Sequence, residues 1–282
     1  MKLQTIVDIP ASPWKIGYED KILMIGSCFS DEIGEQMQQR YLNVTCNPFG
    51  TLYNPLSIAQ ALAITDVPEL IEQEGLWHAM SHHGSFSRAD KNEAEVVIRT
   101  SIETMQKALN EATVIIVTFG TAWVYEKDGE IVGNCHKLPE SCFTRRRLSV
   151  DEIVSAWQPI IARYPDKHWL FTVSPIRHIR DGLHENQLSK ATLLQAIDQL
   201  IKSNNQSSNR QSSNRQYFEA LEIMLDELRD YRFYADDLVH PSSLAVNYIW
   251  ERFVDTFCTP QTKNELVLQH KRWKHEHHLP LH

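Results

Sequence analysis

The chain has 282 residues, a length that suits one large domain or two small ones. Hydrophobic residues make up 42% of it and charged residues 23%, as in ordinary globular proteins, which excludes collagen, coiled coils and wholesale disorder. It carries 28 lysines and arginines against 36 aspartates and glutamates, a formal charge of −8, so no overall positive field attracts nucleic acid.

Neither a secretory signal nor a membrane span is predicted. Asp8 interrupts the N-terminal segment before the apolar core of a signal peptide is complete, and no apolar run reaches the ~18 residues that a membrane helix needs. We therefore expect a cytoplasmic protein without a membrane partner. The five cysteines match no zinc or disulfide spacing and no phosphate-binding glycine motif occurs, so no metal and no cofactor is predicted.

Apolar periodicity predicts strands that alternate with helices, and therefore the α/β fold class, with a mostly parallel sheet and helices on both faces. The run TVIIVTFG at residues 113–120 is typical of a strand that is buried on both faces of such a sheet. Asp128-Gly129 favours the primed turn of a small hairpin. The other expected strands are residues 21–25, 42–46, 123–127, 130–132, 168–173 and 231–234, and the expected helices follow Ser30 and span residues 56–63, 90–111, 150–164, 189–202 and 243–257.

Composition divides the chain into one domain, an insertion and a tail. The repeat QSSNR lies in residues 203–216, where it predicts a disordered surface insertion. Because the repeat has no apolar surface to bury, deleting residues 207–215 is expected to leave stability unchanged. Residues 1–260 are expected to form one α/β domain, followed by a polar, histidine-rich tail at residues 261–282.

The loop after the first strand carries candidate nucleophiles. Its residues, Gly26-Ser27-Cys28-Phe29-Ser30, open directly into a helix, whose free N–H groups are able to receive an oxyanion. Ser27 and Cys28 are both candidates, and a thiol at a helix start beside a histidine is expected to have a lowered pKa. The structural alternative is that Ser27 caps the helix and Cys28 is a small buried residue.

A candidate base lies near the end of the chain. In DDLVHP, Asp237 precedes His240 by three residues, a spacing that lets the carboxylate accept the ring Nδ1–H and orient Nε2 toward a nucleophile. The alternatives are a shift by one residue to Asp236 and a helix-capping aspartate beside a surface histidine. Because sites in such sheets lie beyond the carboxyl ends of the strands, this segment is expected to meet the loop of Cys28.

Basic residues are expected at the rim of the same site. Arg177, His178 and Arg180 follow an expected strand and are suited to clamp an anionic group such as a phosphate or carboxylate. The alternative is a solvated loop. The loops expected to converge are Gly26–Ser30, Asn47–Asn54, Gly120–Trp123 and Ala235–Pro241.

Several of these segments resemble blocks of known families. ILMIGSCFSDEIG is similar to the first block of the SGNH/GDSL hydrolases, and DDLVHPS resembles their final Asp-x-x-His block. Within that superfamily GSCFS closely matches the signature of the GSCFA-domain family, and NPFGTLYNPLSI, FGTAWVY, NCHKLP and SPIRHIRDGLHENQLSKATL resemble further blocks of it. The resemblance, from about Leu23 to Trp250, implies a single flavodoxin-like domain of the SGNH type with a small hairpin insertion.

The resemblance also implies acyl-transfer chemistry, with a departure at the nucleophile. Cys28 stands at the position of the superfamily's serine, and Ser27 takes the place of an aspartate. We expect a hydrolase or acyltransferase for an ester or thioester of a small molecule or saccharide, in which Cys28 forms an acyl-enzyme, His240 moves the proton and Asp237 holds the imidazole. The alternatives are a serine esterase that uses Ser27 and a catalytically silent module that binds acylated or glycan ligands. No oligomeric state is predicted.

A second departure concerns the oxyanion site. The superfamily's third block supplies an asparagine to the oxyanion, and Ala122 stands in its place. The backbone N–H of Gly50, which matches the glycine of the second block, is one expected donor beside the amide of Cys28. The side chains of Asn54 and Thr121 are candidates for the lost amide, although Asn54 is also suited to cap the helix that begins at Pro55.

Overall fold

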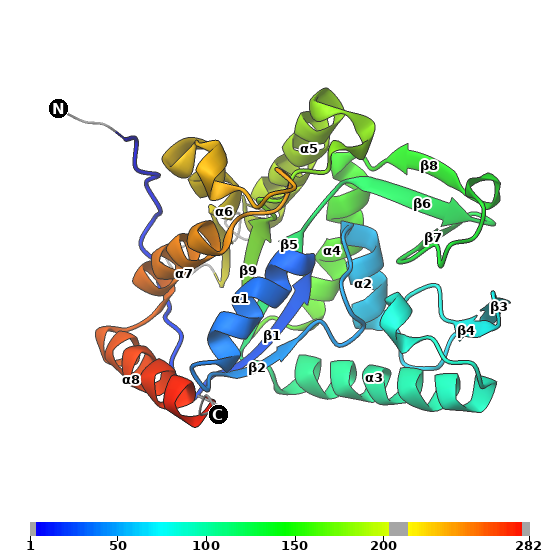
Figure 1. Cartoon of the computed structure of the whole chain (residues 1–282), viewed down its shortest axis with the longest axis horizontal. Coiled ribbons are helices and arrows are strands. Elements are labelled where there is room, and N and C mark those ends of the chain that lie inside the picture. Colours follow the sequence, from blue (N-terminus) through cyan, green and yellow to red (C-terminus); the bar gives the residue numbers. More distant parts are fainter. Residues whose placement is uncertain (1–3, 203–213, 278–282) are drawn as a thin grey trace, which may run out of the picture.

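The computed structural model describes residues 4–202 and 214–277 (Figure 1). Its centre is a five-stranded sheet in the order β10-β9-β5-β1-β2, and every neighbouring pair of strands is parallel. The strands are β1 (Lys21–Gly26), β2 (Asn43–Cys46), β5 (Val114–Phe119), β9 (His168–Val173) and β10 (Arg215–Phe218). The order reverses between β1 and β5, as in flavodoxin-like sheets, and the predicted α/β fold class is confirmed.

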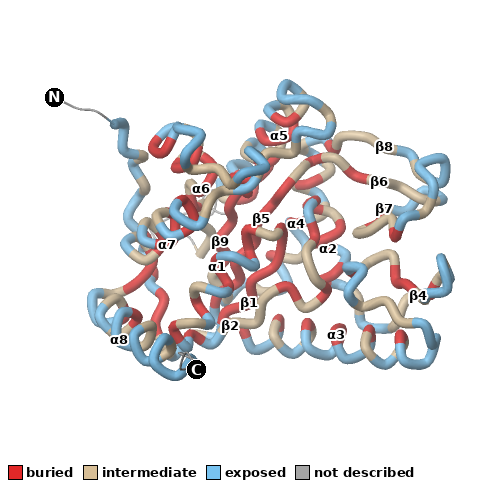
Figure 2. Tube along the Cα trace, viewed as in Figure 1, coloured by how far each residue is buried: buried red, intermediate tan, exposed pale blue. Residues whose placement is uncertain are grey.

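Helices cover both faces of this sheet because alternate residues of each strand point to opposite sides. In β5, Ile115, Val117 and Phe119 lie in an apolar cluster with helices α2 to α5. Val114 and Ile116 lie in a second cluster with α1, α7 and α8. Buried residues are accordingly concentrated along the central strands (Figure 2). The helices are α1 (Cys28–Gln38), α2 (Pro55–Ala63), α3 (Lys91–Glu111), α4 (Val150–Arg163), α5 (Leu183–Lys202), α6 (Ala220–Glu222), α7 (Ser243–Phe257) and α8 (Pro260–Glu276).

A three-stranded antiparallel ribbon stands beside the main sheet (Figure 1). In the turn between its first two strands, φ is 54° at Asp128 and 85° at Gly129, the left-handed values of a type I′ turn. The predicted hairpin is therefore present, and a further strand extends it. The ribbon strands are β6 (Trp123–Lys127), β7 (Glu130–Val132) and β8 (Thr144–Arg147), and a separate small pair is formed by β3 (Ile71–Gln73) and β4 (Leu76–His78).

The last strand of the main sheet differs from the prediction. Residues 231–234, expected as a strand, instead contain the 3₁₀ turn Tyr231–Phe233, in which the side chain of Asp230 accepts a hydrogen bond from the backbone N–H of Arg232. Strand β10 forms earlier, at Arg215–Phe218, and pairs with β9. Only Phe218 of this edge strand is buried, so the segment lacks the apolar run by which the inner strands are recognised.

The insertion predicted from the sequence extends too far toward the C-terminus. Residues 203–213 lie outside the described part of the chain, but β10 belongs to the sheet and Asn214 directly precedes it. The side-chain amide of Asn214 donates to the carbonyl oxygens of Pro165 and Lys167 at 2.7 and 2.9 Å. Its own carbonyl accepts from the backbone N–H of Trp169 at 2.7 Å. Asn214 therefore joins β10 to the start of β9.

These bonds change the outcome expected for a deletion of residues 207–215. Removing Asn214 and Arg215 eliminates hydrogen bonds of about 1 kcal/mol each, so we expect the melting temperature to fall by several degrees. A deletion of residues 207–212 is the matched control and is expected to change the melting temperature little. Thermal unfolding followed by circular dichroism compares the two, and equal melting temperatures would contradict the role of Asn214.

The polar tail predicted from residue 261 contains helix α8. The side chain of Thr259 caps its start by accepting from the backbone N–H of Thr262, and Leu266 packs into the apolar cluster of α1 and α7. The guanidinium of Arg40 lies 3.0 Å from the ring nitrogen Nδ1 of His270. The helix is thus packed against the domain. Within residues 4–202 and 214–277, no helix is long and apolar enough to cross a membrane.

Candidate active site

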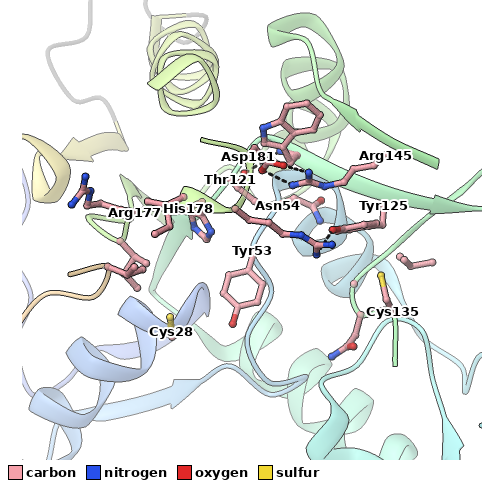
Figure 3. Close-up of a pocket in the computed structure, with 18 of the residues that line it drawn as sticks. Cys28, Tyr53, Asn54, Thr121, Tyr125, Cys135, Arg145, Arg177, His178 and Asp181 are labelled. Carbon is pink, nitrogen blue, oxygen red and sulfur yellow. Dashed lines mark hydrogen bonds and ion pairs between the residues drawn. The ribbon is translucent and has the colours of Figure 1, made fainter. Parts of the chain in front are cut away.

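A cavity of about 500 Å³ opens at the carboxyl ends of β1, β5 and β9 (Figure 3). Each of the four loops expected to converge contributes to its lining. Cys28 comes from the loop after β1, Tyr53 from the loop before α2, Thr121 from the loop after β5, and His240 from the loop before α7. The edge of the sheet therefore carries a small-molecule-sized site at the point where the strand order reverses.

Cys28 faces this cavity, whereas Ser27 does not. Strand β1 ends at Gly26, where φ is 147° and a Cβ atom would lie 2.2 Å from the carbonyl oxygen of Thr118. This close approach brings Cys28 to the first position of α1, where it is partly exposed and lines the cavity. Ser27 occupies the N-cap position, is fully buried, and its hydroxyl has no hydrogen-bond partner in the described structure.

The expected lowering of the Cys28 pKa is wrong. Burial is the largest effect and raises the pKa of the thiol, and the carboxylates of Asp31 and Glu32 in the first turn of α1 raise it further. The backbone N–H groups of Cys28 and Phe29 lower the pKa, but by less. The thiol is therefore the resting form, and a base must remove its proton before it reacts as a nucleophile.

Asp237 and His240 are paired as predicted from their spacing. The ring nitrogen Nδ1 of His240 lies 2.6 Å from Oδ2 of Asp237, and His240 lines the cavity. Oδ1 of the same carboxylate accepts hydrogen bonds from the backbone N–H groups of Val239 and His240. These bonds and the bond to the His240 ring lower the pKa of Asp237 to about 2. Within the described residues, the side chain of Asp236 takes no part in this arrangement. The carboxylate is thus ionised near neutral pH and fixes the imidazole.

The expected oxyanion donor Gly50 is engaged elsewhere. Its backbone N–H donates to the carbonyl oxygen of Asn47 at 2.7 Å, and it does not line the cavity. The φ of Gly50 is 76°, and a Cβ atom on this residue would lie only 2.3 Å from Cβ of His83, which explains why glycine occupies this position. The residue shapes a turn rather than presenting a free N–H, a role that the sequence spacing does not distinguish from donation.

Asn54 and Thr121 line the cavity but also have structural partners. Oδ1 of Asn54 accepts the backbone N–H of Ser57 at 2.8 Å and its amide nitrogen lies 2.9 Å from the hydroxyl of Ser57, which makes Asn54 the cap of α2. The hydroxyl of Thr121 lies 3.1 Å from that of Ser189 and accepts the backbone N–H of Trp123. Among the predicted donors, the backbone N–H of Cys28 stands at the first position of α1, where no carbonyl of the helix is placed to accept it.

The basic residues at the rim play different parts. Arg180 pairs with Glu140 and donates to the hydroxyl of Tyr125. Arg177 donates to the carbonyl oxygen of Leu238 and forms no ion pair within residues 4–202 and 214–277. It is therefore the rim arginine with capacity for an anionic group of a ligand.

His178 cannot act as the cationic clamp that was expected. Burial lowers its pKa to about 3, and the charges of Lys190 and His240 lower it in the same direction. The imidazole is therefore neutral. Its backbone N–H donates to the side-chain oxygen of Asn186 at 2.9 Å, and the ring meets that of Tyr53 edge-on at 6.0 Å.

A buried lysine beneath the site was not predicted. Nζ of Lys190 donates to the carbonyl oxygens of Gly120 and Ser174 at 2.7 and 2.8 Å, just beyond the ends of β5 and β9. Burial lowers its pKa to about 7, and the charge of Cys28 acts in the opposite direction. The signal in the sequence was a lysine on the same helical stripe as the buried Leu193 and Ile197 of α5.

The ribbon forms the opposite wall of the cavity. The guanidinium of Arg145 lies over the rings of Trp123 and Tyr125, 4.7 and 5.1 Å from their centroids, and pairs with Asp181 after β9 (Figure 3). The next two arginines of β8 also form ion pairs. Arg146 pairs with Glu126 and Glu152, and Arg147 pairs with Glu185 of α5. These contacts, which join segments far apart in the chain, were not predicted.

Three histidines, His78, His82 and His136, lie close together without forming a metal site. Rings of His78 and His136 lie 4.4 Å apart, and His82 stacks on Phe49 at 3.9 Å. Within the described residues no group of three or more histidine, cysteine, aspartate or glutamate side chains has the arrangement to hold a metal ion. Nε2 of His82 instead bonds the hydroxyl of Ser101 at 2.8 Å. His82 thus fills the core as a neutral ring.

This buried ring makes the fold sensitive to acid. Burial lowers the pKa of His82 from 6.5 to about 4, so below pH 6.5 the unfolded chain binds a proton that the native state does not. We expect the free energy of unfolding to be highest above pH 6.5 and to fall toward pH 4, by up to ~3 kcal/mol from this residue. Urea unfolding between pH 4 and 8 measures the slope, and His82→Gln should flatten it. An unchanged slope in that variant would refute the assignment.

Comparisons with known proteins agree with the family resemblance. The model of the GSCFA family matches residues 21–253. Two solved structures are similar over 90% of this chain and 99% of their own, both at 10% identity: a carbohydrate esterase of family 3 from Talaromyces cellulolyticus, with a TM-score of 0.38, and a mutant acetyl esterase with acetate ion, with a TM-score of 0.37. No curated protein sequence matches the chain. Since the family model spans most of the chain, the protein belongs to the GSCFA family.

Proposed function

We propose that the protein is a hydrolase or acyltransferase for esters or thioesters that works through an acyl-enzyme on Cys28. One observation carries the proposal. Cys28, at the start of α1, and His240, held by Asp237, line the same cavity at the carboxyl edge of the sheet. A candidate nucleophile, a candidate base and its orienting carboxylate therefore lie at one cavity, which supports acyl transfer.

The chemistry follows from the protonation states of these groups. His240 takes the proton of the Cys28 thiol as the sulfur attacks the substrate carbonyl, whose oxygen becomes negatively charged. The backbone N–H of Cys28 faces this oxyanion. When the intermediate collapses, the bond to the leaving group breaks and His240 returns the proton to it. Water, or the hydroxyl or amine of an acceptor, then releases the acyl group from the sulfur by the same steps.

The cavity supports a small-molecule or saccharide ester as the substrate. Its volume of about 500 Å³ lies in the range of small-molecule sites. Aromatic side chains of Tyr53, Trp123 and Tyr125 form much of its wall, and Arg177 offers a cation to a negatively charged group on the substrate. We infer that an ester carrying such a group is bound more tightly than a neutral one.

A second candidate is a catalytically silent module that binds acylated or glycan ligands. The raised pKa of Cys28 and the engagement of Gly50 in a turn favour this alternative. It predicts ligand binding without turnover and without an acyl adduct.

Two measurements decide between the candidates. A panel of p-nitrophenyl esters and of thioesters tests turnover, and incubation with iodoacetamide or a fluorophosphonate followed by peptide mass mapping locates the reactive residue. We expect turnover and modification of the peptide that contains Cys28. Turnover with modification of Ser27 would show a serine esterase, and binding of acylated ligands without turnover or adduct would show the silent module.

A further inference from the structure

The ring of His178 ends in a polar atom without a partner. Its Nε2 is buried and makes no hydrogen bond in the described structure. A Cβ atom placed on Gly120 would lie 3.3 Å from this nitrogen and 3.3 Å from Cβ of Ser27. Nε2 is thus directed to the point where the loops after β1 and β5 meet, beside the first residue of α1. An unpaired buried polar group destabilises a fold, so its presence at this place calls for an explanation.

The position of the ring is fixed from several sides. The backbone N–H of His178 donates to Asn186 of α5, and Tyr53 meets the ring edge-on. Lys190 binds the carbonyl oxygen of Gly120 at 2.7 Å and so fixes the loop against which Nε2 lies. His178 and Cys28 line the same cavity, and Figure 3 shows His178 beside Tyr53. Nε2 itself is covered, so the loop of Gly120 must shift before this nitrogen is able to contact a group bound to Cys28.

The ring is also held in the form that donates a hydrogen bond without carrying charge. Burial and the nearby Lys190 and His240 disfavour the imidazolium. A neutral imidazole has one N–H, and in the tautomer that carries it on Nε2 the ring keeps this proton while it donates to a developing negative charge. Such a group differs from His240, which is half exposed, bonded to a carboxylate and suited to exchange a proton.

We propose that Nε2–H of His178 is the second donor to the oxyanion, together with the backbone N–H of Cys28. This inference rests on the proposed function. As the bond from sulfur to the substrate carbon forms, the carbonyl oxygen gains negative charge and accepts both N–H groups. No proton passes to or from His178. When the carbonyl bond forms again, the leaving group departs with the proton that His240 carries, and Nε2 returns to its unpaired state.

The test compares His178→Ala with His178→Gln, whose side-chain amide is able to place an N–H near the position of Nε2. We expect His178→Ala to lower kcat by ~10²–10³-fold with little change in KM, and His178→Gln to retain most of the activity. An alkyl trifluoromethyl ketone, which forms a tetrahedral adduct with a thiol, should bind more weakly to His178→Ala by a similar factor. Alkylation of Cys28 by iodoacetamide forms no oxyanion and should proceed at the same rate in all three proteins.

The possible outcomes of this test distinguish between roles for His178. Slower alkylation in both variants would show that His178 acts as a base or holds the fold, and would overturn the inference. Unchanged kcat and ketone binding in His178→Ala would overturn it as well, while leaving the proposed function intact. If the unaltered protein neither turns over any ester or thioester nor forms the ketone adduct, the proposed function fails, and the inference fails with it.

Discussion

Replacing Cys28 by alanine is expected to abolish both turnover and the covalent adduct. Removal of a nucleophile eliminates the acyl-enzyme path, a loss on the order of 10⁴-fold or more in kcat. Ser27→Ala is the matched control from the adjacent residue. Because the Ser27 hydroxyl is fully buried and does not line the cavity, that variant should retain the adduct and lose at most ~10²–10³-fold in activity. Ester turnover and peptide mass mapping measure the two effects.

The raised pKa of Cys28 adds a dependence on pH to this experiment. The alkylation rate of a thiol follows its thiolate fraction, so the rate should be low near pH 7 and still rise through pH 9. A rate that is already at its plateau at neutral pH would show that His240 draws the thiol proton in the resting enzyme. Loss of the adduct in Ser27→Ala and its survival in Cys28→Ala would refute the assignment of the nucleophile.

Replacing Asp237 by asparagine is expected to lower kcat by ~10⁴-fold with a much smaller change in KM. The carboxylate holds Nδ1 of His240 at 2.6 Å; in the proposed mechanism it also stabilises the imidazolium, and an amide would favour the wrong tautomer. Because the pKa of Asp237 is lowered to about 2, the carboxylate is ionised throughout an assay near neutral pH. Steady-state kinetics on the best ester of the panel give both constants.

Asp236→Asn provides the control for this prediction. Asp236 is exposed and precedes the paired carboxylate by one residue, so its loss removes the same formal charge without touching the ring. We expect at most a few-fold change in kcat. A large loss in Asp236→Asn together with an active Asp237→Asn would show that the base is oriented differently in the working enzyme.

Much of the fold was predictable because its inner strands are continuous runs of apolar residues. The run that became β5 is buried at all six positions, and the capping box of Ser149 and Glu152 marks the start of α4. Strand β10 was missed because an edge strand has only one neighbour and needs no continuous apolar run. The segment at residues 231–234 has aromatic residues that favour a strand, but local hydrogen bonds to Asp230 close a turn there instead.

The site was predictable to the extent that strand ends determine it. Cys28 lies where a parallel strand ends, as expected, whereas His240 reaches the same cavity from the loop before α7, although the strand expected before that loop is a turn. The pKa of Cys28 was not predictable, because it depends on a balance between burial and the N–H groups of the helix start that only coordinates reveal. Gly50 was misjudged because its N–H closes a local turn onto Asn47, and Lys190 was missed because its partners come from other segments of the chain.

The cavity has two walls of different origin. One wall, with Cys28 and His240, is built by the loops of the parallel sheet, whereas the other belongs to the ribbon β6–β8. Ion pairs of the β8 arginines with Asp181 and Glu185 attach the ribbon to the domain. Under the proposed function, the reacting groups therefore lie on one structural unit and part of the wall that contacts the substrate lies on another. Residues of the ribbon are the place to redesign which acyl or leaving group is accepted, since substitutions there leave the reacting groups on their own scaffold.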